Sequence, residues 1–177
     1  VVEYKDIGVK YWDAENYEKV IEYYEGEGYG KPWSKYYLGM AAQAIAEKEH
    51  AKMNRVISVL QGKYYYWPLA YPDDYKFNYV KCLDMYNSSI KYYEEYIKEE
   101  RVPDYDPTKA QARKSRGAIV TSAHEATDLY SKYTTLLSEA TTKYAQHKYQ
   151  IEQQKAAEAA RNAELAKGIT NLIGSFF

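Results

Sequence analysis

Few side chains in this 177-residue chain have both the type and the spacing needed for catalysis or metal binding. His124 and Asp128 lie one helical turn apart, a spacing that can ligate a metal ion, but no third ligand accompanies them. The other histidines, His50 and His147, are far away along the chain. The single cysteine, Cys82, excludes an internal disulfide framework and a cysteine-based zinc site. We therefore expect no metal centre.

Acidic pairs and reactive motifs give no better candidate for an active site. Glu94–Glu95 and Glu99–Glu100 would act as general acids only if a pocket raised one pKa, and a solvated helix face is the preferred interpretation. Asp104-Tyr105-Asp106 lacks the glycine and the later glutamate of a calcium loop. The chain has no nucleophile elbow, phosphate-binding loop or dinucleotide fingerprint. The sequence thus predicts a non-catalytic protein without a cofactor.

The charge and hydrophobicity of the chain argue against nucleic acid as a partner and against a membrane-spanning segment. The net charge of −1, from 24 basic and 25 acidic residues, argues against a nucleic-acid binder that works by phosphate neutralisation. No run of about 18 apolar residues exists, so no segment is expected to span a membrane. A basic cluster at 109–116 could contact an acidic partner or a lipid surface, although a solvated first helical turn is the commoner arrangement.

The first residue bears on the expected compartment. The chain starts at Val1 rather than methionine, which fits both a cleaved signal peptide and a trimmed chain. We leave the localisation open on this ground, with a bacterial periplasmic or secreted location as the favoured expectation.

Tyrosine is the most unusual feature of the composition. The chain has 23 tyrosines against three tryptophans and three phenylalanines, and 19 of the tyrosines lie within residues 1–105. A tyrosine ring buries a large apolar surface, whereas its hydroxyl needs a polar partner or water. Thin helical layers and tyrosine-rich sheets both meet that need. The spacing of the apolar residues decides in favour of helices.

This spacing predicts two pairs of helices in the first 62 residues. The larger residues of 4–24 recur every three or four positions, with Asn16 as the N-cap of the second helix and a glycine cluster at 26–30 as its end. Ser34 is a candidate N-cap for the next helix. The apolar residues at 56–60 indicate a separate partner helix that ends near Gly62.

The middle of the chain contains one expected loop. Residues 63–72 carry two prolines and an aromatic run, which predict an ordered loop packed on the body, with a β-strand at 63–67 as the alternative. The apolar spacing over 73–100 predicts either one long helix or a hairpin broken near Asn87.

The C-terminal region is expected to be a long helix. Asp106–Pro107 combines an acidic cap with a proline in the first turn, and Gly117 is a candidate interruption further on. The polar, alanine-rich stretch 152–167 predicts a solvated helix that ends at Gly168. An apolar stripe follows, and we expect it to be covered by the body or by a second copy of the chain; it comprises Ile169, Leu172, Ile173, Phe176 and Phe177.

A set of residues in the first hairpin follows a known spacing pattern: Tyr4, Ile7, Gly8, Tyr11, Val20, Tyr24 and Pro32. These positions resemble seven of the eight fixed positions of a tetratricopeptide repeat, a helical pair of 34 residues. Glu27 departs clearly, because a small residue is expected there. A second unit, marked by Leu38 and Gly39, and a third at 89–96 resemble the repeat less completely.

The resemblance implies an all-α fold. Hairpins of this family stack into a right-handed solenoid, in which each pair buries its face on the next. Residues 1–103 would then form TPR-like helical repeats. Residues 104–177 would form a long C-terminal capping or protruding helix, or a helical hairpin, with an apolar terminal segment.

The resemblance also implies a non-catalytic scaffold or adaptor that binds a protein or peptide on a concave surface. The clamp by which some members hold a C-terminal carboxylate is not expected, because Val9 and Tyr37 stand where its asparagines would be. Trp12 and Trp33 could instead pack between hairpins. The residues carried over to the concave surface by register are Val2, Lys5, Val9, Trp12, Trp33, Tyr36, Met40 and Gln43.

Two other functions fit the sequence. The helix over 108–177 could form intermolecular bundle contacts, which would make the protein a structural homo-oligomer. The tyrosine and tryptophan side chains could alternatively form a carbohydrate-binding surface.

Overall fold

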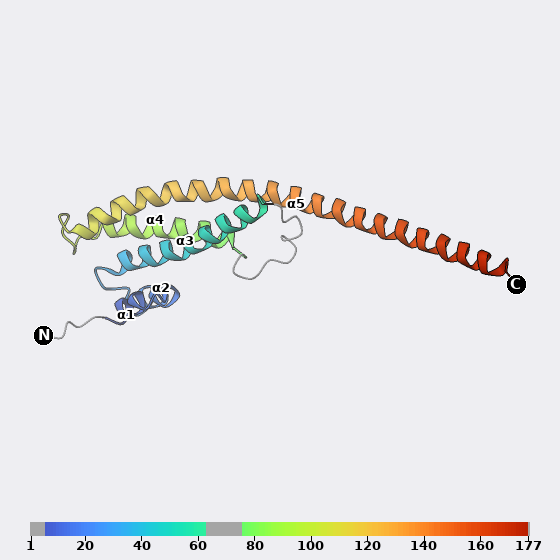
Figure 1. The fold of residues 1–177 in the computed structure, drawn as a ribbon. Helices are drawn as coiled ribbons and strands as arrows, with labels where there is room; N and C mark the ends of the chain where they lie inside the picture. Colours follow the sequence, from blue (N-terminus) through green and yellow to red (C-terminus); the bar gives the residue numbers. More distant parts are fainter. Residues whose placement is uncertain (1–5, 63–75, 177) are drawn as a thin grey trace.

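The computed structural model describes residues 6–62 and 76–176, and within them every regular element is an α-helix. This confirms the all-α class for the described residues. The loop predicted over 63–72 lies outside them. Within residues 6–62 and 76–176, none of the helices combines the length and the hydrophobicity of a membrane-spanning segment. The helices, shown in Figure 1, are α1 (Ile7–Asp13), α2 (Tyr17–Glu25), α3 (Ser34–Leu60), α4 (Tyr79–Ile97) and α5 (Pro107–Gly174).

Helices α1 and α2 form the predicted N-terminal hairpin. Asp6 caps α1 by accepting a hydrogen bond from the Val9 amide (2.8 Å), and Asn16 caps α2. The first turn of α1 lies against the last turn of α2, because Gly8 packs on the ring of Tyr24. A β-carbon at Gly8 would lie only 2.5 Å from that ring, so the close approach of the two helices requires glycine.

Helix α3 corrects the prediction of a second hairpin. Residues 34–60 form one helix of 27 residues, because the run between its two apolar ends consists mainly of strong helix formers without glycine or proline. The buried stripe also continues through this run at Ala46, Glu49 and Met53. Ser34 is the first helical residue rather than the N-cap, and its hydroxyl donates to the carbonyl of Tyr29 (3.0 Å).

Helix α4 is likewise one helix, without the break considered near Asn87. It packs along α3 through a tight contact, since a β-carbon at Gly39 would lie 2.9 Å from the ring of Tyr93. The fully buried Ser89 donates to the carbonyl of Gly39 (2.6 Å). The main core lies between α3, α4 and the first half of α5, and includes Ala46, Met53, Ile57, Cys82, Tyr86, Tyr93, Tyr96, Ala112, Ile119 and Ala126.

Helix α5 begins as predicted, with Asp106 as its N-cap and Pro107 in its first turn. It has 68 residues and continues through Gly117 and Gly168, so the predicted end at Gly168 is wrong. Neither glycine occupies a positive-φ conformation, and the helical run on either side supplies the backbone hydrogen bonds. The first half of α5 packs along α3 and α4, whereas its C-terminal part projects alone from the body (Figure 1).

Candidate functional site

The main candidate site is an open hollow of about 460 Å³ between the α1–α2 hairpin, the face of α3 and the start of α5. We call it the aromatic pocket. One of its sides comes from the hairpin, its floor from α3 and α4, and its other side from α5. Its lining residues are Trp12, Tyr17, Tyr36, Met40, Gln43, Ala44, Glu47, Tyr93, Gln111 and Ser115.

Four of the side chains assigned by register to a concave surface meet in this pocket. Trp12 comes from the end of α1, and α3 supplies Tyr36, Met40 and Gln43 at steps of four and three residues along one helix face. The half-buried Val9 does not line the pocket. Val2 and Lys5 lie outside the described residues.

The aromatic rings of the pocket are held in place by neighbouring rings. The ring of Trp12 lies 5.3 Å from that of Tyr17 and 6.3 Å from that of Tyr37. The ring of Tyr36 lies 5.1 Å from that of Tyr96 and 6.2 Å from that of Tyr93. These separations are typical of packed aromatic pairs. Trp12 therefore takes part in the packing between helices and also faces the pocket.

A short chain of hydrogen bonds runs along the floor of the pocket. The hydroxyl of Tyr93 donates to Oε1 of Gln43 (2.9 Å), and Nε2 of Gln43 donates to Oε1 of Glu47 (2.8 Å). On the α5 side, Nε2 of Gln111 donates to the hydroxyl of Ser115 (3.0 Å). This chain leads from the buried ring of Tyr93 to the exposed carboxylate of Glu47.

The tyrosines of the pocket remain protonated at neutral pH. Burial raises the pKa of Tyr93, and the neighbouring Tyr36 adds to this effect. Burial likewise raises the pKa of Tyr36 and of Tyr17, and the charges of Glu15 and Glu47 raise that of Tyr17 further. The pocket thus offers aromatic faces, neutral hydrogen-bonding groups and one carboxylate, a set suited to binding.

Sequence reasoning missed six lining residues: Tyr17, Ala44, Glu47, Tyr93, Gln111 and Ser115. Ala44 follows Met40 by four residues, and Glu47 follows Gln43 by four residues. With residues 34–60 taken as one helix, this spacing would have placed both on the same helix face as Met40 and Gln43. The residues from α4 and α5 carry no such signal, because they reach the pocket only through the packing of distant helices.

The structure places Trp33 away from this pocket, in a cluster around the buried carboxylate of Asp6. Nε1 of Trp33, Nζ of Lys31 and the hydroxyl of Tyr24 each donate to this carboxylate at 2.9 Å. Burial alone would raise the pKa of Asp6, but the hydrogen bonds from Lys31, the Val9 amide, Trp33 and Tyr24 outweigh it and hold the pKa below its ordinary value. The cluster joins the start of α1 to the end of α2 and to the α2–α3 connection.

The structure also places the histidines and the cysteine that were considered for metal binding. Within the described residues, no group of three or more histidine, cysteine, aspartate or glutamate side chains is placed to hold a metal ion. Nδ1 of His50 lies 2.8 Å from the hydroxyl of Tyr86, and burial lowers the pKa of this imidazole. Cys82 is fully buried, and burial raises the pKa of its thiol to about 11, which keeps it protonated.

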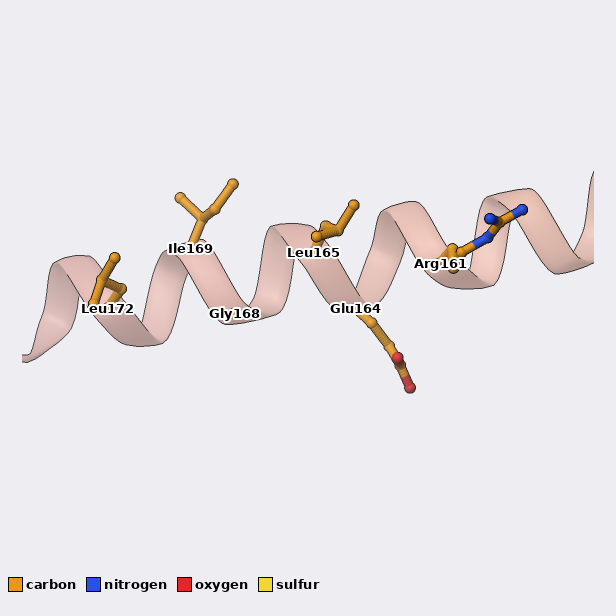
Figure 2. Close-up of a pocket in the computed structure, with 6 residues that line it drawn as sticks. All are labelled: Arg161, Glu164, Leu165, Gly168, Ile169 and Leu172. Carbon is orange, nitrogen blue, oxygen red and sulfur yellow. The ribbon is translucent and has the colours of Figure 1, made fainter.

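A second surface lies at the far end of α5. Figure 2 shows Leu165, Ile169 and Leu172 on one side of the helix, and Glu164 pointing away from them. They line a shallow hollow of about 470 Å³, and each exposes more than half of its surface. The predicted stripe over 169–177 is exposed at Ile169, Leu172, Ile173 and Phe176, so the expectation that these residues fold back onto the body is wrong; Phe177 lies outside the described residues. We call this second surface the terminal stripe; it comprises Leu165, Ile169, Leu172, Ile173 and Phe176.

Comparison with protein-family models, with curated proteins and with solved structures finds no match for this chain.

Proposed function

We propose that this protein is a non-catalytic, TPR-like module that binds an extended segment of a protein or peptide in the aromatic pocket. The observation that carries the proposal is the convergence of Trp12 with Tyr36, Met40 and Gln43. These residues come from two separate helices and were assigned to one binding surface by register alone. Their meeting in one hollow supports a shared role in binding.

The chemistry of the lining suits a peptide. Tryptophan and tyrosine supply large contact areas with few rotatable bonds, and they are the residues most enriched at the energetic centres of protein interfaces. Met40 adds an adaptable apolar surface between the rings. Gln43 on α3 and Gln111 on α5 both line the pocket, and their amide groups can exchange hydrogen bonds with the backbone of a bound segment.

The pocket is also well supported, which lowers the cost of ordering it on binding. Its floor lies on α3 and α4, two helices that pack closely along each other through Gly39 and Tyr93. Tyr93 exposes only 1% of its surface, and Tyr36 is fixed between Tyr93 and Tyr96. A bound segment would therefore meet side chains that are already in place.

A pocket-filling variant tests this proposal without removing the aromatic walls. Ala44→Phe places a ring inside the pocket, and Ala51→Phe makes the same change on the exposed face of the same helix. A random peptide library displayed on phage is selected against the full chain, and the recovered peptides are then titrated against both variants. We expect Ala44→Phe to weaken binding at least about tenfold, which corresponds to about 1.4 kcal/mol, and Ala51→Phe to leave it unchanged. Recovery of no peptide, or equal binding to both variants, would refute the proposal.

A second candidate function, structural self-association, is favoured by the projecting end of α5. Residues 150–176 are exposed throughout, and the terminal stripe has no partner within the described chain. Helices in solution owe most of their stability to the packing of an apolar face. The charged residues of this segment alternate in sign every three positions: Glu152, Lys155, Glu158, Arg161, Glu164 and Lys167. Their net charge is zero, so two copies of the segment can meet without net repulsion.

The oligomeric state of the full chain tests this second candidate. Ile169→Lys with Leu172→Lys places two charges in the terminal stripe, and Gln153→Lys with Gln154→Lys adds the same charge to the projecting helix outside it. If the stripe joins two copies, sedimentation velocity detects a dimer that the first pair of changes abolishes and the second retains. A wild-type chain that stays monomeric at high protein concentration would exclude this function.

A further inference from the structure

We infer that the aromatic pocket selects a basic side chain, arginine or lysine, within the peptide that it binds. This inference deepens the proposed function and rests on it. The lining contains the carboxylate of Glu47 and the rings of Trp12, Tyr17 and Tyr36, and none of its described residues is a lysine, arginine or histidine. Aromatic faces and a carboxylate together attract a cation more strongly than either does alone.

The same chain holds two of its own lysines by this combination of groups. Nζ of Lys31 lies 5.4 Å from the ring centre of Tyr23 and 5.8 Å from that of Trp33, and it forms an ion pair with Asp6 at 2.9 Å.

The second of these lysines is Lys35. Its Nζ lies 4.4 Å from the ring centre of Tyr29 and 5.5 Å from that of Tyr92, and it pairs with Glu95 at 3.0 Å. Each of the two sites thus consists of two rings and one carboxylate around one ammonium group. The aromatic pocket contains an equivalent set of groups, namely the rings of Trp12 and Tyr17 and the carboxylate of Glu47.

The carboxylate of Glu47 is available for such a contact. Its Oε1 accepts the hydrogen bond from Gln43, its side chain is exposed, and no basic group of the described residues lies within 4.0 Å of it. Its charge reaches across the pocket, because it contributes to the raised pKa of Tyr17 on one side and of Tyr93 on the floor. Glu15 adds to the negative potential at Tyr17. A basic side chain would therefore enter a region of favourable potential.

Arginine fits these groups especially well. Its planar guanidinium stacks on aromatic faces and can donate two hydrogen bonds to one carboxylate, whereas a lysine ammonium acts as a point charge. The uncharged analogue citrulline has nearly the same shape and lacks the charge. A comparison of arginine with citrulline therefore isolates the electrostatic part of the recognition.

The test uses the full chain labelled with ¹⁵N and blocked tripeptides of the form acetyl-Gly-X-Gly-amide, where X is arginine, lysine or citrulline. The reporter is the indole N–H signal of Trp12, assigned by its loss in Trp12→Phe. We expect the arginine and lysine peptides to shift this signal and to bind about three- to tenfold more tightly than the citrulline peptide. Glu47→Gln keeps an acceptor for Gln43 and should remove this preference. Glu164→Gln, the same change on the far end of α5, should retain it.

The outcomes separate the inference from the function on which it rests. Equal binding of arginine and citrulline peptides at Trp12, or an arginine preference that survives Glu47→Gln, overturns the cation selectivity and leaves peptide binding standing. A Trp12 signal that responds to none of the tripeptides also overturns the selectivity. Peptide binding itself is refuted only if the library selection recovers no peptide, or if Ala44→Phe and Ala51→Phe bind the recovered peptides equally.

Discussion

Replacement of Asp6 by alanine tests whether the N-terminal hairpin depends on one buried carboxylate. Asp6 exposes 6% of its surface and accepts hydrogen bonds from the Val9 amide, Tyr24, Lys31 and Trp33. Asp6→Ala removes all four acceptor contacts at once. It leaves the donors in place, in a site shaped around the missing group.

The expected loss of stability follows from those contacts. Removal of a helix N-cap costs about 1 kcal/mol. The hydroxyl of Tyr24, which is fully buried, loses its acceptor, and such an unsatisfied group costs about 1–3 kcal/mol. Lys31 exposes 32% of its side chain, so water screens its ion pair and the loss of that pair adds less than about 1 kcal/mol. We expect Asp6→Ala to lower the free energy of unfolding by about 2–5 kcal/mol in total.

Urea denaturation followed by circular dichroism measures this loss, and hydrogen exchange of the α1 and α2 amides shows whether the hairpin opens before the rest. Asp128→Ala, a change at an exposed aspartate of α5, serves as the control and should stay within about 0.5 kcal/mol of the wild type. If Asp6→Ala also stays within this range and leaves hairpin exchange unchanged, the reasoning about the cluster is wrong.

The pH dependence of the free energy of unfolding, compared between the wild type and Asp6→Asn, tests the direction of the pKa shift of Asp6. The pKa of Asp6 is lower in the folded chain than its ordinary value of 3.8, so the carboxylate binds fewer protons in the folded state. Its contribution is complete above pH 3.8 and declines as the pH falls through the lowered folded pKa. Asp6→Asn should therefore flatten this part of the stability profile, and its deficit relative to the wild type should shrink in acid.

Three further predictions concern packing. Gly8→Ala should cost about 1–3 kcal/mol in urea denaturation, because the added methyl group meets the Tyr24 ring, whereas Gly117→Ala, which meets nothing within 4 Å, should stabilise α5 by about 0.5–1 kcal/mol. Cys82 should react with a thiol reagent only after unfolding, and rapid labelling of the native chain would contradict its burial. Ile119→Ala should cost about 2–5 kcal/mol and Leu165→Ala less than about 0.5, because α5 buries only the first of these residues; equal losses would show that the far end of α5 is also packed.

Local sequence signals predicted the helix ends that depend on local chemistry. Asp106 and Pro107 start α5, and Asn16 starts α2, because a side chain that caps a backbone amide acts within three residues of its own position. The hairpin of α1 and α2 followed from the same kind of signal. Gly8 and Tyr24 both belong to the spacing pattern described for this hairpin, and the structure has the two residues in contact.

The continuity of α3 could not be read in this way. Its buried stripe passes through the charged residue Glu49, which the apolar spacing does not mark as part of a stripe. In the folded chain Glu49 exposes 8% of its surface, and its Oε2 accepts a hydrogen bond from the amide of Asn78 (2.8 Å), 29 residues further along. A buried carboxylate with a distant partner leaves no periodic signal in the sequence.

The candidate site was predicted in the part that lies on α1 and α3. The resemblance to a tetratricopeptide repeat assigned Trp12 and Tyr36 to one surface, and both residues line the aromatic pocket. Tyr93, Gln111 and Ser115 were missed, because their positions depend on how α4 and α5 pack against α3. Glu47 and its charge were missed for another reason, because residues 34–60 were predicted as two helices rather than the single helix α3.

The unbroken course of α5 fixes the distance between the two surfaces described above. Gln111 lies in the pocket wall and Leu165 begins the terminal stripe, and both belong to one continuous helix. At a rise of about 1.5 Å per residue, the helix separates them by about 80 Å along its axis. If both proposed functions hold, a second copy of the chain at the terminal stripe would lie about 80 Å from a peptide in the aromatic pocket, so the two binding events would not obstruct each other.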